Sequence, residues 1–413
     1  MADSPVSESL KEISPLEKNG PNCHVTSLER PYLGNSWVEI SQSAYTSNLK
    51  FFREIIGNNT ELSVVVKANA YGHGLQGTAR LAAQAGADSF CVHSIDEAMR
   101  LRRSGFRQNI LVMGHVPLDR LEEVVEHNLR IALFNRESLL RLQDITGEGR
   151  HLVRVHLKLE TGTYRHGIAA EDLNWFLKKL RHTPRIILEA VYTHYANIED
   201  TANQEYAEYQ QYAFAQLVKM VKKSGFPILR RHSACTAAIL LFPATHMEMV
   251  RLGVGQYGLW PSLETLNAAR ERFGEEVAAR LQPVLTWKTR IAQLKTVPAD
   301  NTIGYGRTYR TTRETRIAVL PVGYSDGYDR LLSNRGEVLI RGQRAPVLGR
   351  ICMNLMMVDV TDIEDAILED EVVLLGRQGE DEITADEMAE LCETINYEAV
   401  ARINPDLARV VVL

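Results

Sequence analysis

The feature of this sequence that most constrains its fold is a regular alternation of short apolar runs with longer amphipathic stretches. The runs are rich in Val, Ile and Leu and are bounded by turn residues, which is typical of parallel strands buried on both faces. They are LSVVVKA (62–68), SFCVHS (89–94), NILVMG (109–114), RIALFN (130–135), LVRVHLKLE (152–160), LEAVYTH (188–194), ILRRHSA (228–234) and MVRLGVG (249–255).

The stretches between these runs have helical patterns, such as LQGTARLAAQAG, DEAMRLRRSG and LDRLEEVVEHN, and each ends near Gly or Asn. Eight strands alternating with helices over roughly 225 residues are what a (β/α)8 barrel requires. An open doubly wound sheet is the competing arrangement, but no GxGxxG follows the first strand. The pattern therefore predicts an α/β fold whose N-terminal (β/α)8 barrel spans residues 36–275.

The periodicity shortens beyond about residue 283. Segments such as VLTWKTRIAQLKTV, ETRIAVLPVGY, EVLIRG and EVVLLG are separated by Gly, Asn and Asp turns and are typical of strands. They predict a C-terminal, mainly β domain over residues 276–413. The strand-like WVEI at 37–40 precedes the first helix and is a candidate strand of that domain.

Composition excludes several classes of protein. Residues 1–35 lack the cationic start and apolar core of a signal peptide, and their Ser, Glu and Pro content predicts a flexible tail. Lys and Arg number 47 against 52 Asp and Glu, which argues against a nucleic-acid binder. No apolar stretch approaches the roughly 18 residues of a membrane span. The five cysteines form no CxxC pair, so we expect no metal site and a reducing, cytoplasmic setting.

One lysine stands where a barrel places its chemistry. Catalytic groups of such barrels lie at the carboxyl ends of the strands, and Lys67 follows the run LSVVV and precedes ANAYGHG. Burial there lowers the pKa of an amine and makes its neutral form a usable nucleophile or base. Position alone fits an ordinary exposed lysine better, but the longer string VVKANAYGHG is more specific.

The string VVKANAYGHG resembles the alanine racemase family, and the similarity continues from WVEI at 37 to the C-terminus. Members of this family use pyridoxal 5′-phosphate (PLP) on a barrel joined to a β domain. The resemblance implies that Lys67 forms the Schiff base with PLP and serves as the base on one face of the substrate. It also implies that the hydroxyl of Tyr71, otherwise a packed aromatic at the barrel rim, reaches the cofactor phosphate.

Inversion at Cα needs a second base on the opposite face, and the segment TIGYGRTYR resembles the family string that supplies it. Tyr305 matches the catalytic tyrosine, whereas Tyr309 is a weaker candidate. In the family this tyrosine reaches the site of the partner subunit, which implies a homodimer with shared active sites. A tyrosine has a reference pKa of about 10, so positive neighbours must help it act as a base. His232 matches the family histidine expected to hydrogen-bond this tyrosine.

Further positions match family residues that contact the cofactor. The resemblance implies a role for Arg251 opposite the pyridine nitrogen, where a cation disfavours protonation of the ring and suppresses side reactions such as transamination. The remaining implied cofactor contacts are His194 near the ring and Thr236, Gly253, Val254 and Tyr397 at the phosphate.

Other matches concern the substrate. Arg165 in ETGTYRHG matches the arginine that steadies the carboxylate, and Met353 in RICMN matches a backbone donor to the same group. Tyr324 in PVGYSDGYDR matches a tyrosine that narrows the pocket. Lys158 falls on a lysine that is carbamylated in some members of the family.

Two positions depart from the usual family pattern. TGTYRHG replaces the frequent TGMGRLG and puts the bulky Tyr164 before the arginine, and RICMN carries Asn354 where many members have Asp. An amide supplies no negative charge, so the electrostatics near the substrate must differ. These departures leave open how exclusively the protein prefers alanine.

The resemblance implies a racemase that interconverts L- and D-alanine and supplies D-alanine for peptidoglycan in the cell wall. A serine or broad-specificity amino-acid racemase with the same residues is the main alternative. A non-catalytic PLP-binding homeostasis protein is an alternative of another class, but such proteins resemble only the barrel. An amino-acid decarboxylase is disfavoured by RICMN and PVGYSDGYDR.

Overall fold

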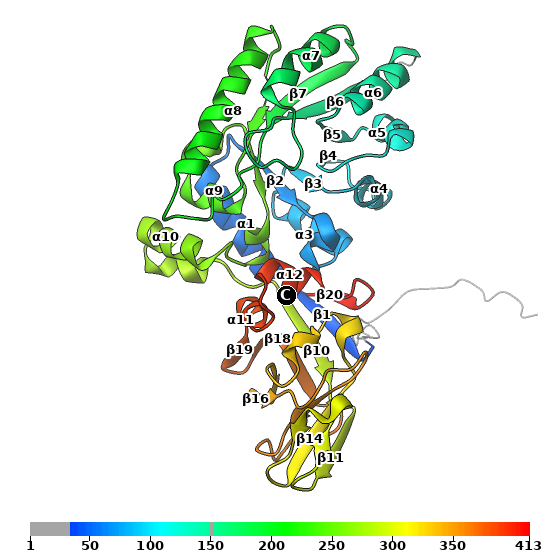
Figure 1. Ribbon diagram of the computed structural model, residues 1–413, viewed down its shortest axis with the longest axis vertical. Helices are drawn as coiled ribbons and strands as arrows, with labels where there is room; N and C mark the ends of the chain where they lie inside the picture. The colour runs from blue at the N-terminus through cyan, green and yellow to red at the C-terminus, as the bar shows by residue number, and fades with distance from the viewer. Residues whose placement is uncertain (1–33, 149–151, 229) are drawn as a thin grey trace, which may run out of the picture. The chain divides into compact units, whose positions relative to one another are not determined.

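The structure is a computed structural model that describes residues 34–148, 152–228 and 230–413. Of the predicted tail over residues 1–35, residues 1–33 lie outside the described part. Eight parallel strands form one sheet in the order β8-β7-β6-β5-β4-β3-β2-β9, as Figure 1 shows in part. They are β2 (Glu61–Val65), β3 (Ser89–Val92), β4 (Asn109–Val112), β5 (Arg130–Leu133), β6 (Val153–Lys158), β7 (Ile186–Tyr192), β8 (Arg230–His232) and β9 (Met249–Leu252).

The sheet curls into a nearly closed barrel. β9 pairs with β2 along one of its edges. Along its other edge it meets the residues that follow β8, where the backbone N–H of Arg251 donates to the carbonyl of Ala234 at 3.0 Å. Each strand corresponds to one of the eight apolar runs, so the predicted α/β barrel is confirmed. The strands are almost wholly buried, because helices cover the outside of the barrel and side chains fill its inside.

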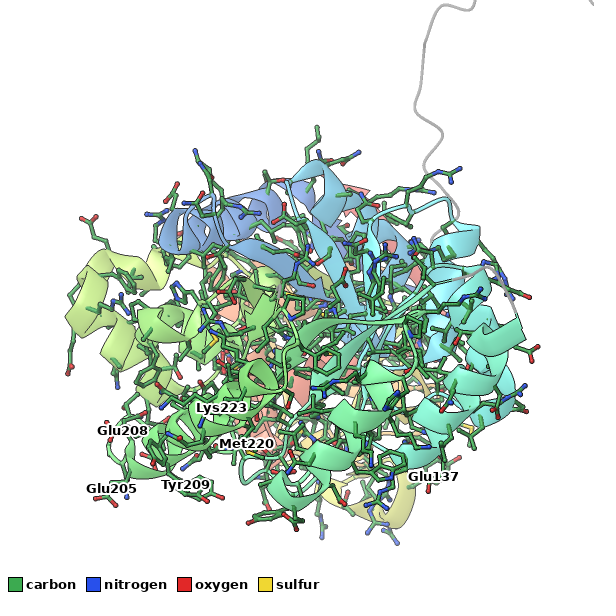
Figure 2. All side chains as sticks on the ribbon, turned by 90° about the horizontal axis from the view of Figure 1, so that it is seen from above. Glu137, Glu205, Glu208, Tyr209, Met220 and Lys223 are labelled. Atoms are coloured by element: carbon green, nitrogen blue, oxygen red, sulfur yellow. The ribbon has the colours of Figure 1, made fainter. Side chains whose placement is uncertain are left out.

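Helices follow the strands and form the outer layer. They are α1 (Gln42–Ile56), α3 (Leu75–Gln84), α4 (Ile95–Arg103), α5 (Leu121–Glu126), α6 (Arg136–Glu148), α7 (Ala170–Arg181), α8 (Glu205–Lys223), α9 (Thr236–Leu241) and α10 (Leu263–Phe273). The outward face of α8 carries charged side chains such as Glu205, Glu208 and Lys223 (Figure 2). Its other face buries Phe214, Leu217 and Val221 against the barrel.

The C-terminal part is mainly β, as predicted. Its larger sheet has the order β16-β15-β18-β10-β1-β20, with β19 paired to β18, and a second sheet has the order β11-β14-β17. The strands are β1 (Ser36–Ser41), β10 (Leu285–Arg290), β11 (Gln293–Val297), β12 (Thr302–Ile303), β13 (Tyr309–Arg310), β14 (Thr315–Leu320), β15 (Glu337–Ile340), β16 (Gln343–Pro346), β17 (Met356–Asp359), β18 (Glu371–Gln378), β19 (Asp381–Ile383) and β20 (Ala408–Val412).

The early strand β1 belongs to this C-terminal sheet, which confirms the interpretation of WVEI. Val38 lies opposite Trp287 of β10 and Arg409 of β20. Two short helices, α11 (Ala385–Leu391) and α12 (Asn396–Ala401), connect the sheet to the barrel side, where Asn396 donates to the Trp260 carbonyl at 2.9 Å. In the described part of the chain, no helix has both the length and the apolar character that crossing a membrane demands.

Candidate active site

A cavity of about 970 Å³ opens at the carboxyl ends of the barrel strands. Tyr397 on α12 and Thr394 just before it complete the wall, so the C-terminal part contributes to the cavity. The cavity brings together most of the residues predicted from the sequence: Lys67, Tyr71, Lys158, Arg165, His194, Thr236, Arg251, Gly253, Val254 and Tyr397.

Lys67 opens an unusual element, the short turn α2 (Lys67–Tyr71), whose backbone is left-handed. Ala68 has φ 53° and ψ 53°, and Asn69 and Ala70 have nearly the same angles. Non-glycine residues in this region cost about 1–2 kcal/mol each, so the surroundings must hold the turn in place. The Ala68 N–H donates to Glu97 Oε1 at 2.7 Å, and Asn69 Oδ1 accepts from the Leu75 N–H at 3.0 Å.

The C-terminal part holds the same turn from the other side. The guanidinium of Arg409 donates to the carbonyl of Gly72 at 3.0 and 3.1 Å. Gly72 has φ +85°, and a Cβ there would lie 2.0 Å from the carbonyl oxygen of Val400. Only glycine therefore permits this approach, which fixes the turn that carries Lys67 against the C-terminal segment.

Burial and charge favour the neutral form of Lys67. Desolvation is the main cause of its lowered pKa, the guanidinium of Arg165 adds to the effect, and Glu97 opposes it. The side-chain nitrogen Nζ lies 5.9 Å from the centre of the Tyr71 ring. A neutral amine at the end of a barrel strand is a competent nucleophile and proton acceptor.

Hydroxyls and backbone groups converge at one end of the cavity. Thr236 Oγ1 accepts from the N–H groups of Gly253 at 3.1 Å and Gly255 at 3.3 Å, which leaves its own proton free to donate. A Cβ on Gly253 would lie 3.4 Å from the Tyr71 hydroxyl and 3.5 Å from Thr236 Oγ1. This space lined by donors, which a side chain at Gly253 would fill, fits a phosphate group.

Arg251 enters the cavity wall from β9 and is only 4% exposed. Its Nη2 donates to the carbonyls of Thr193 at 2.9 Å and Ser233 at 3.1 Å, and its Nη1 lies 2.6 Å from His232 Nδ1. The adjacent His194 has a pKa far below its ordinary value, because burial and the charge of Arg251 both disfavour its protonation.

The role expected for His232 is wrong. This histidine is fully buried behind Arg251, and its second ring nitrogen, Nε2, lies 3.0 Å from His156 Nδ1. Both nitrogens are therefore occupied, and the ring also stacks on Tyr192 with 4.6 Å between centres. His232 has no nitrogen left to hydrogen-bond Tyr305, because its matched position lies inside the barrel rather than on the cavity wall.

Tyr305, Tyr324 and Met353 lie on the C-terminal part and are 72%, 42% and 56% exposed, and none of them lines the cavity that contains Lys67. The loops of Tyr324 and Met353 are joined, because the Tyr324 N–H donates to the Cys352 carbonyl at 3.1 Å. Tyr309 pairs with Ile303 in the two-stranded sheet of β12 and β13, so its backbone is part of the fold of this segment.

Comparisons with known proteins agree with this geometry. Residues 40–261 match the family described as alanine racemase, N-terminal domain, and residues 284–411 match alanine racemase, C-terminal domain. The alanine racemase of Leptospira interrogans is 38% identical over 92% of this chain and 96% of its own length. The chain belongs to the alanine racemase family. It is therefore a racemase, which is an isomerase.

Solved structures of alanine racemases share the whole architecture. The crystal structure of the enzyme from Bacillus anthracis with bound L-Ala-P has a TM-score of 0.86 and 34% identity, and it covers 93% of this chain and 96% of its own. A histidine racemase from Leuconostoc mesenteroides has a TM-score of 0.80 and 26% identity, covering 93% and 99%. Proteins of this architecture are thus named for more than one amino acid.

The two departures from the family pattern lie on exposed loops. Tyr164 is 85% exposed and has φ 50°, so a bulky residue occupies a left-handed backbone conformation that glycine adopts without strain. The Asn354 amide donates to Ser325 Oγ at 2.8 Å and thereby ties the Met353 loop to the Tyr324 loop.

Lys158 has a strongly perturbed environment within this racemase. It is 8% exposed, and burial, reinforced by Arg165 and Arg251, lowers its pKa from 10.5 to about 8. Its Nζ lies 5.7 Å from the centre of the Tyr192 ring. The amine is therefore partly neutral near neutral pH, which is the form that reacts with carbon dioxide.

Several residues of the site were not predicted from the sequence. They are Glu97, which holds the Lys67 turn, and His156, Glu189 and Tyr192, which lie on β6 and β7. His156 precedes Lys158 by two positions on one strand, so the alternation of side chains predicts that both face the same side of the barrel sheet. Glu97 carries a weaker signal, the capping box that it forms with Ser94.

Proposed function

We propose that this chain interconverts L- and D-alanine, with pyridoxal phosphate as cofactor and with Lys67 and Tyr305 exchanging protons at opposite faces of Cα. The main support is the position of Lys67. Its amine lies on a strained turn, with a lowered pKa, in the same cavity as a group of phosphate donors.

The residues present fit the cofactor. Thr236, Tyr71, Tyr397 and the backbone around Gly253 would hold its phosphate, and Lys67 would hold its aldehyde end through the amine. Arg251 would face the ring nitrogen from its fixed place on β9. When bound, pyridoxal phosphate would withdraw the electron pair that remains on Cα after a proton leaves.

The chain's own groups would then complete the reaction. Arg165, at the mouth of the cavity, would bind the carboxylate of alanine by a charge-assisted hydrogen bond, and the backbone of Met353 would contact the same group. Lys67 would move the proton on one face of Cα, and Tyr305 the proton on the other. Tyr324 would narrow the access to the site, which favours a small amino acid.

We propose that Tyr305 acts in the cavity of a second copy of the chain. Tyr305, Tyr324 and Met353 are exposed on the C-terminal part and lie outside the residues that line the Lys67 cavity. A symmetric homodimer brings such a surface to the partner's barrel twice, and so completes two sites at once.

We also propose that the enzyme works in the cytoplasm and supplies D-alanine for peptidoglycan. The four cysteines in the described part, Cys91, Cys235, Cys352 and Cys392, are unpaired, which fits a reducing compartment. D-alanine for the cell wall is the use that the family resemblance implies.

A broader substrate range is the second candidate. The exposed Tyr164 and the amide of Asn354 change the surroundings of the substrate, and one structural relative is named a histidine racemase. The same catalytic residues would serve serine or a larger amino acid. The alanine racemase and the broader racemase would therefore differ only in which side chain of the substrate the pocket accepts.

One experiment tests both candidates. Racemisation of a panel of L-amino acids, with and without added pyridoxal phosphate, is measured for the wild type and for Lys67→Ala. We expect alanine to be the best substrate, and Lys67→Ala to lose both the cofactor absorbance and the activity. Normal racemisation by Lys67→Ala would contradict the proposed mechanism, and a higher kcat/KM for serine would favour the broader range.

A further inference from the structure

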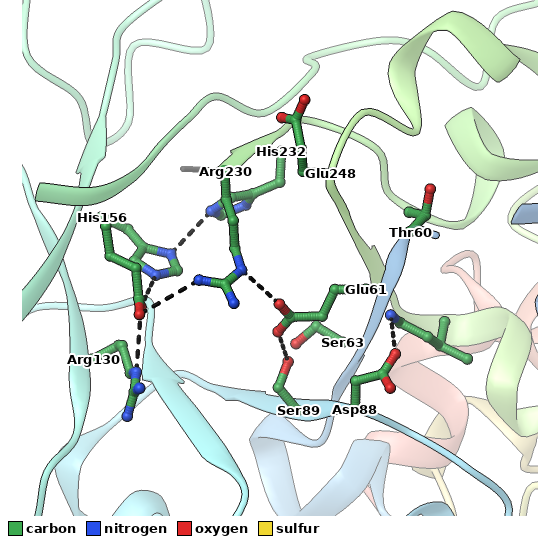
Figure 3. A network of polar contacts seen from close by, with 12 residues as sticks. Thr60, Glu61, Ser63, Asp88, Ser89, Arg130, His156, Arg230, His232 and Glu248 are labelled. Atoms are coloured by element: carbon green, nitrogen blue, oxygen red, sulfur yellow. Dashed lines mark hydrogen bonds and ion pairs between the residues drawn. The ribbon is translucent and has the colours of Figure 1, made fainter. Parts of the chain in front are cut away.

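A chain of buried hydrogen bonds runs from Arg251 to the amino-terminal end of the barrel. His232 Nδ1 lies 2.6 Å from Arg251 Nη1, and His232 Nε2 lies 3.0 Å from His156 Nδ1. His156 Nε2 then lies 3.2 Å from Glu189 Oε2. All four residues are less than 9% exposed and come from four neighbouring strands. Figure 3 shows the link between the two histidines.

The donors and acceptors of this chain can be arranged in only one way. A guanidinium has donors alone, so His232 Nδ1 must accept from Arg251 and the ring proton of His232 must be on Nε2. That proton points to His156 Nδ1, which must accept it, and His156 in turn donates from Nε2 to Glu189. A proton added to either ring would break a hydrogen bond, so both histidines are neutral.

Glu189 fixes the far end of the chain. Although burial raises its pKa, the hydrogen bond from His156 and the charge of Arg130 outweigh this effect and lower it to about 2. The Nε of Arg130 lies 3.3 Å from Glu189 Oε2, and Arg230 and Arg154 approach the other oxygen at 3.5 and 3.6 Å. Glu189 at the end of the hydrogen-bond chain is thus always ionised, and its carboxylate can accept a hydrogen bond but cannot donate one.

We propose that Glu189 and His156 are positioning residues for Arg251, and that through His232 they hold its guanidinium in one orientation at the cavity wall. This inference rests on the proposed function, in which Arg251 faces the ring nitrogen of the bound cofactor. The carboxylate sets the tautomer of His156, and His156 sets that of His232. The unprotonated Nδ1 of His232 then accepts from Nη1 of Arg251, while the carbonyls of Thr193 and Ser233 accept from Nη2. Glu189 and His156, at the end of the barrel opposite to the cavity, thereby help to define where the guanidinium of Arg251 lies.

A matched control is present in the same network. Glu61 is also a partly buried carboxylate at this end of the barrel, where it pairs with Arg230 at 2.7 Å and accepts from Ser89 Oγ at 2.6 Å. Figure 3 shows both contacts, and neither reaches a histidine. Glu61→Gln therefore removes a similar charge and no hydrogen bond of the chain from Glu189 to Arg251, although its partner Arg230 also lies 3.5 Å from Glu189.

The test is 15N NMR of histidine-labelled holoenzyme at neutral pH, with the signals assigned by their absence from His156→Gln and His232→Gln proteins. We expect both rings to be neutral and protonated on Nε2 in the wild type. Glu189→Gln should lose this single pattern, since an amide can also donate, and kcat should fall about ten-fold while KM for alanine changes less than two-fold. Glu61→Gln should keep the pattern and a kcat within about two-fold of the wild type.

Several results would overturn the proposal. One is a protonated ring or an Nδ1 proton on either histidine in the wild type. This result does not depend on Glu189→Gln, so it decides the matter if that variant does not fold. Another is an equal effect of Glu189→Gln and Glu61→Gln on kcat, which would show a general charge effect. The NMR signals do not depend on racemisation, so a protein that fails to racemise alanine would contradict the proposed function alone.

Discussion

Lys158 shows how the cavity changes the chemistry of a single residue. Its pKa of about 8, against an ordinary 10.5, means that the neutral amine becomes abundant as the pH rises through 8 rather than above 10. The cause is burial, with further repulsion from Arg165 and Arg251. A carbamate formed there would carry a negative charge and relieve that repulsion.

We therefore expect Lys158 to bind carbon dioxide. With 13C-labelled carbon dioxide at constant dissolved concentration, a carbamate NMR signal should grow between about pH 7 and pH 9, because only the unprotonated amine reacts. Lys158→Met should lack the signal. A signal of equal size in both proteins, or one that does not change with pH, would contradict this assignment.

The sequence predicts single residues well where a motif names them and poorly where only packing does. Lys67, Tyr71 and Arg251 meet in one cavity because they lie on or just after strands whose carboxyl ends share one mouth. The predicted role of His232 was wrong because a motif identifies a position in the sequence but does not say which side chains the ring contacts in the fold. His156 and Glu189 were missed because an isolated polar residue on an apolar strand carries no motif.

The turn that carries Tyr305 depends on glycines on either side of it. Gly304 and Gly306 both have φ +74°, a conformation that strains other residues. A Cβ on Gly306 would lie 2.9 Å from the Arg350 guanidinium, so this cation packs directly on the turn. The position of the Tyr305 hydroxyl is thus set by backbone that tolerates little change.

We expect Gly306→Ala to lower kcat about ten-fold, because the guanidinium of Arg350 must move off the turn and no longer holds Tyr305 in place. Gly342→Ala is the matched control, since Gly342 has φ +75° but its nearest neighbouring atom would be 3.5 Å away. Both variants should lose similar stability in urea unfolding, and only Gly306→Ala should lose activity. Equal kcat values in the two proteins would show that Tyr305 does not need this turn.

Elements differ in how far the sequence predicts them. The eight barrel strands were found because each is a short apolar run between turn residues, and β1 because WVEI is isolated before the first helix. The left-handed turn Lys67–Tyr71 was not predictable, since Ala rarely adopts this conformation and Asn does so as a single residue. Contacts such as those with Glu97 and Arg409 stabilise it. Tertiary contacts decide such an element, and local propensity opposes it.

At the scale of the whole molecule, the chain divides the two proposed bases between its two parts. The barrel holds Lys67 in a cavity that α12 helps to close, whereas Tyr305 is 72% exposed on the C-terminal part. In the proposed mechanism, Tyr305 acts only when the surface that carries it meets a cavity with Lys67. The proposed dimer would cover Tyr305 with the barrel of a second copy, and it is the central claim to test.

Mixing two inactive variants tests this claim most directly. Lys67→Ala and Tyr305→Phe homodimers are each assayed for alanine racemisation, then unfolded together, refolded with pyridoxal phosphate and assayed again. In a shared site, each hybrid dimer has one cavity with both Lys67 and the partner's tyrosine intact, so activity should return to about a quarter of the wild-type value. If Tyr305 instead served its own chain, every hybrid site would lack one base, and the mixture would stay as inactive as its parents.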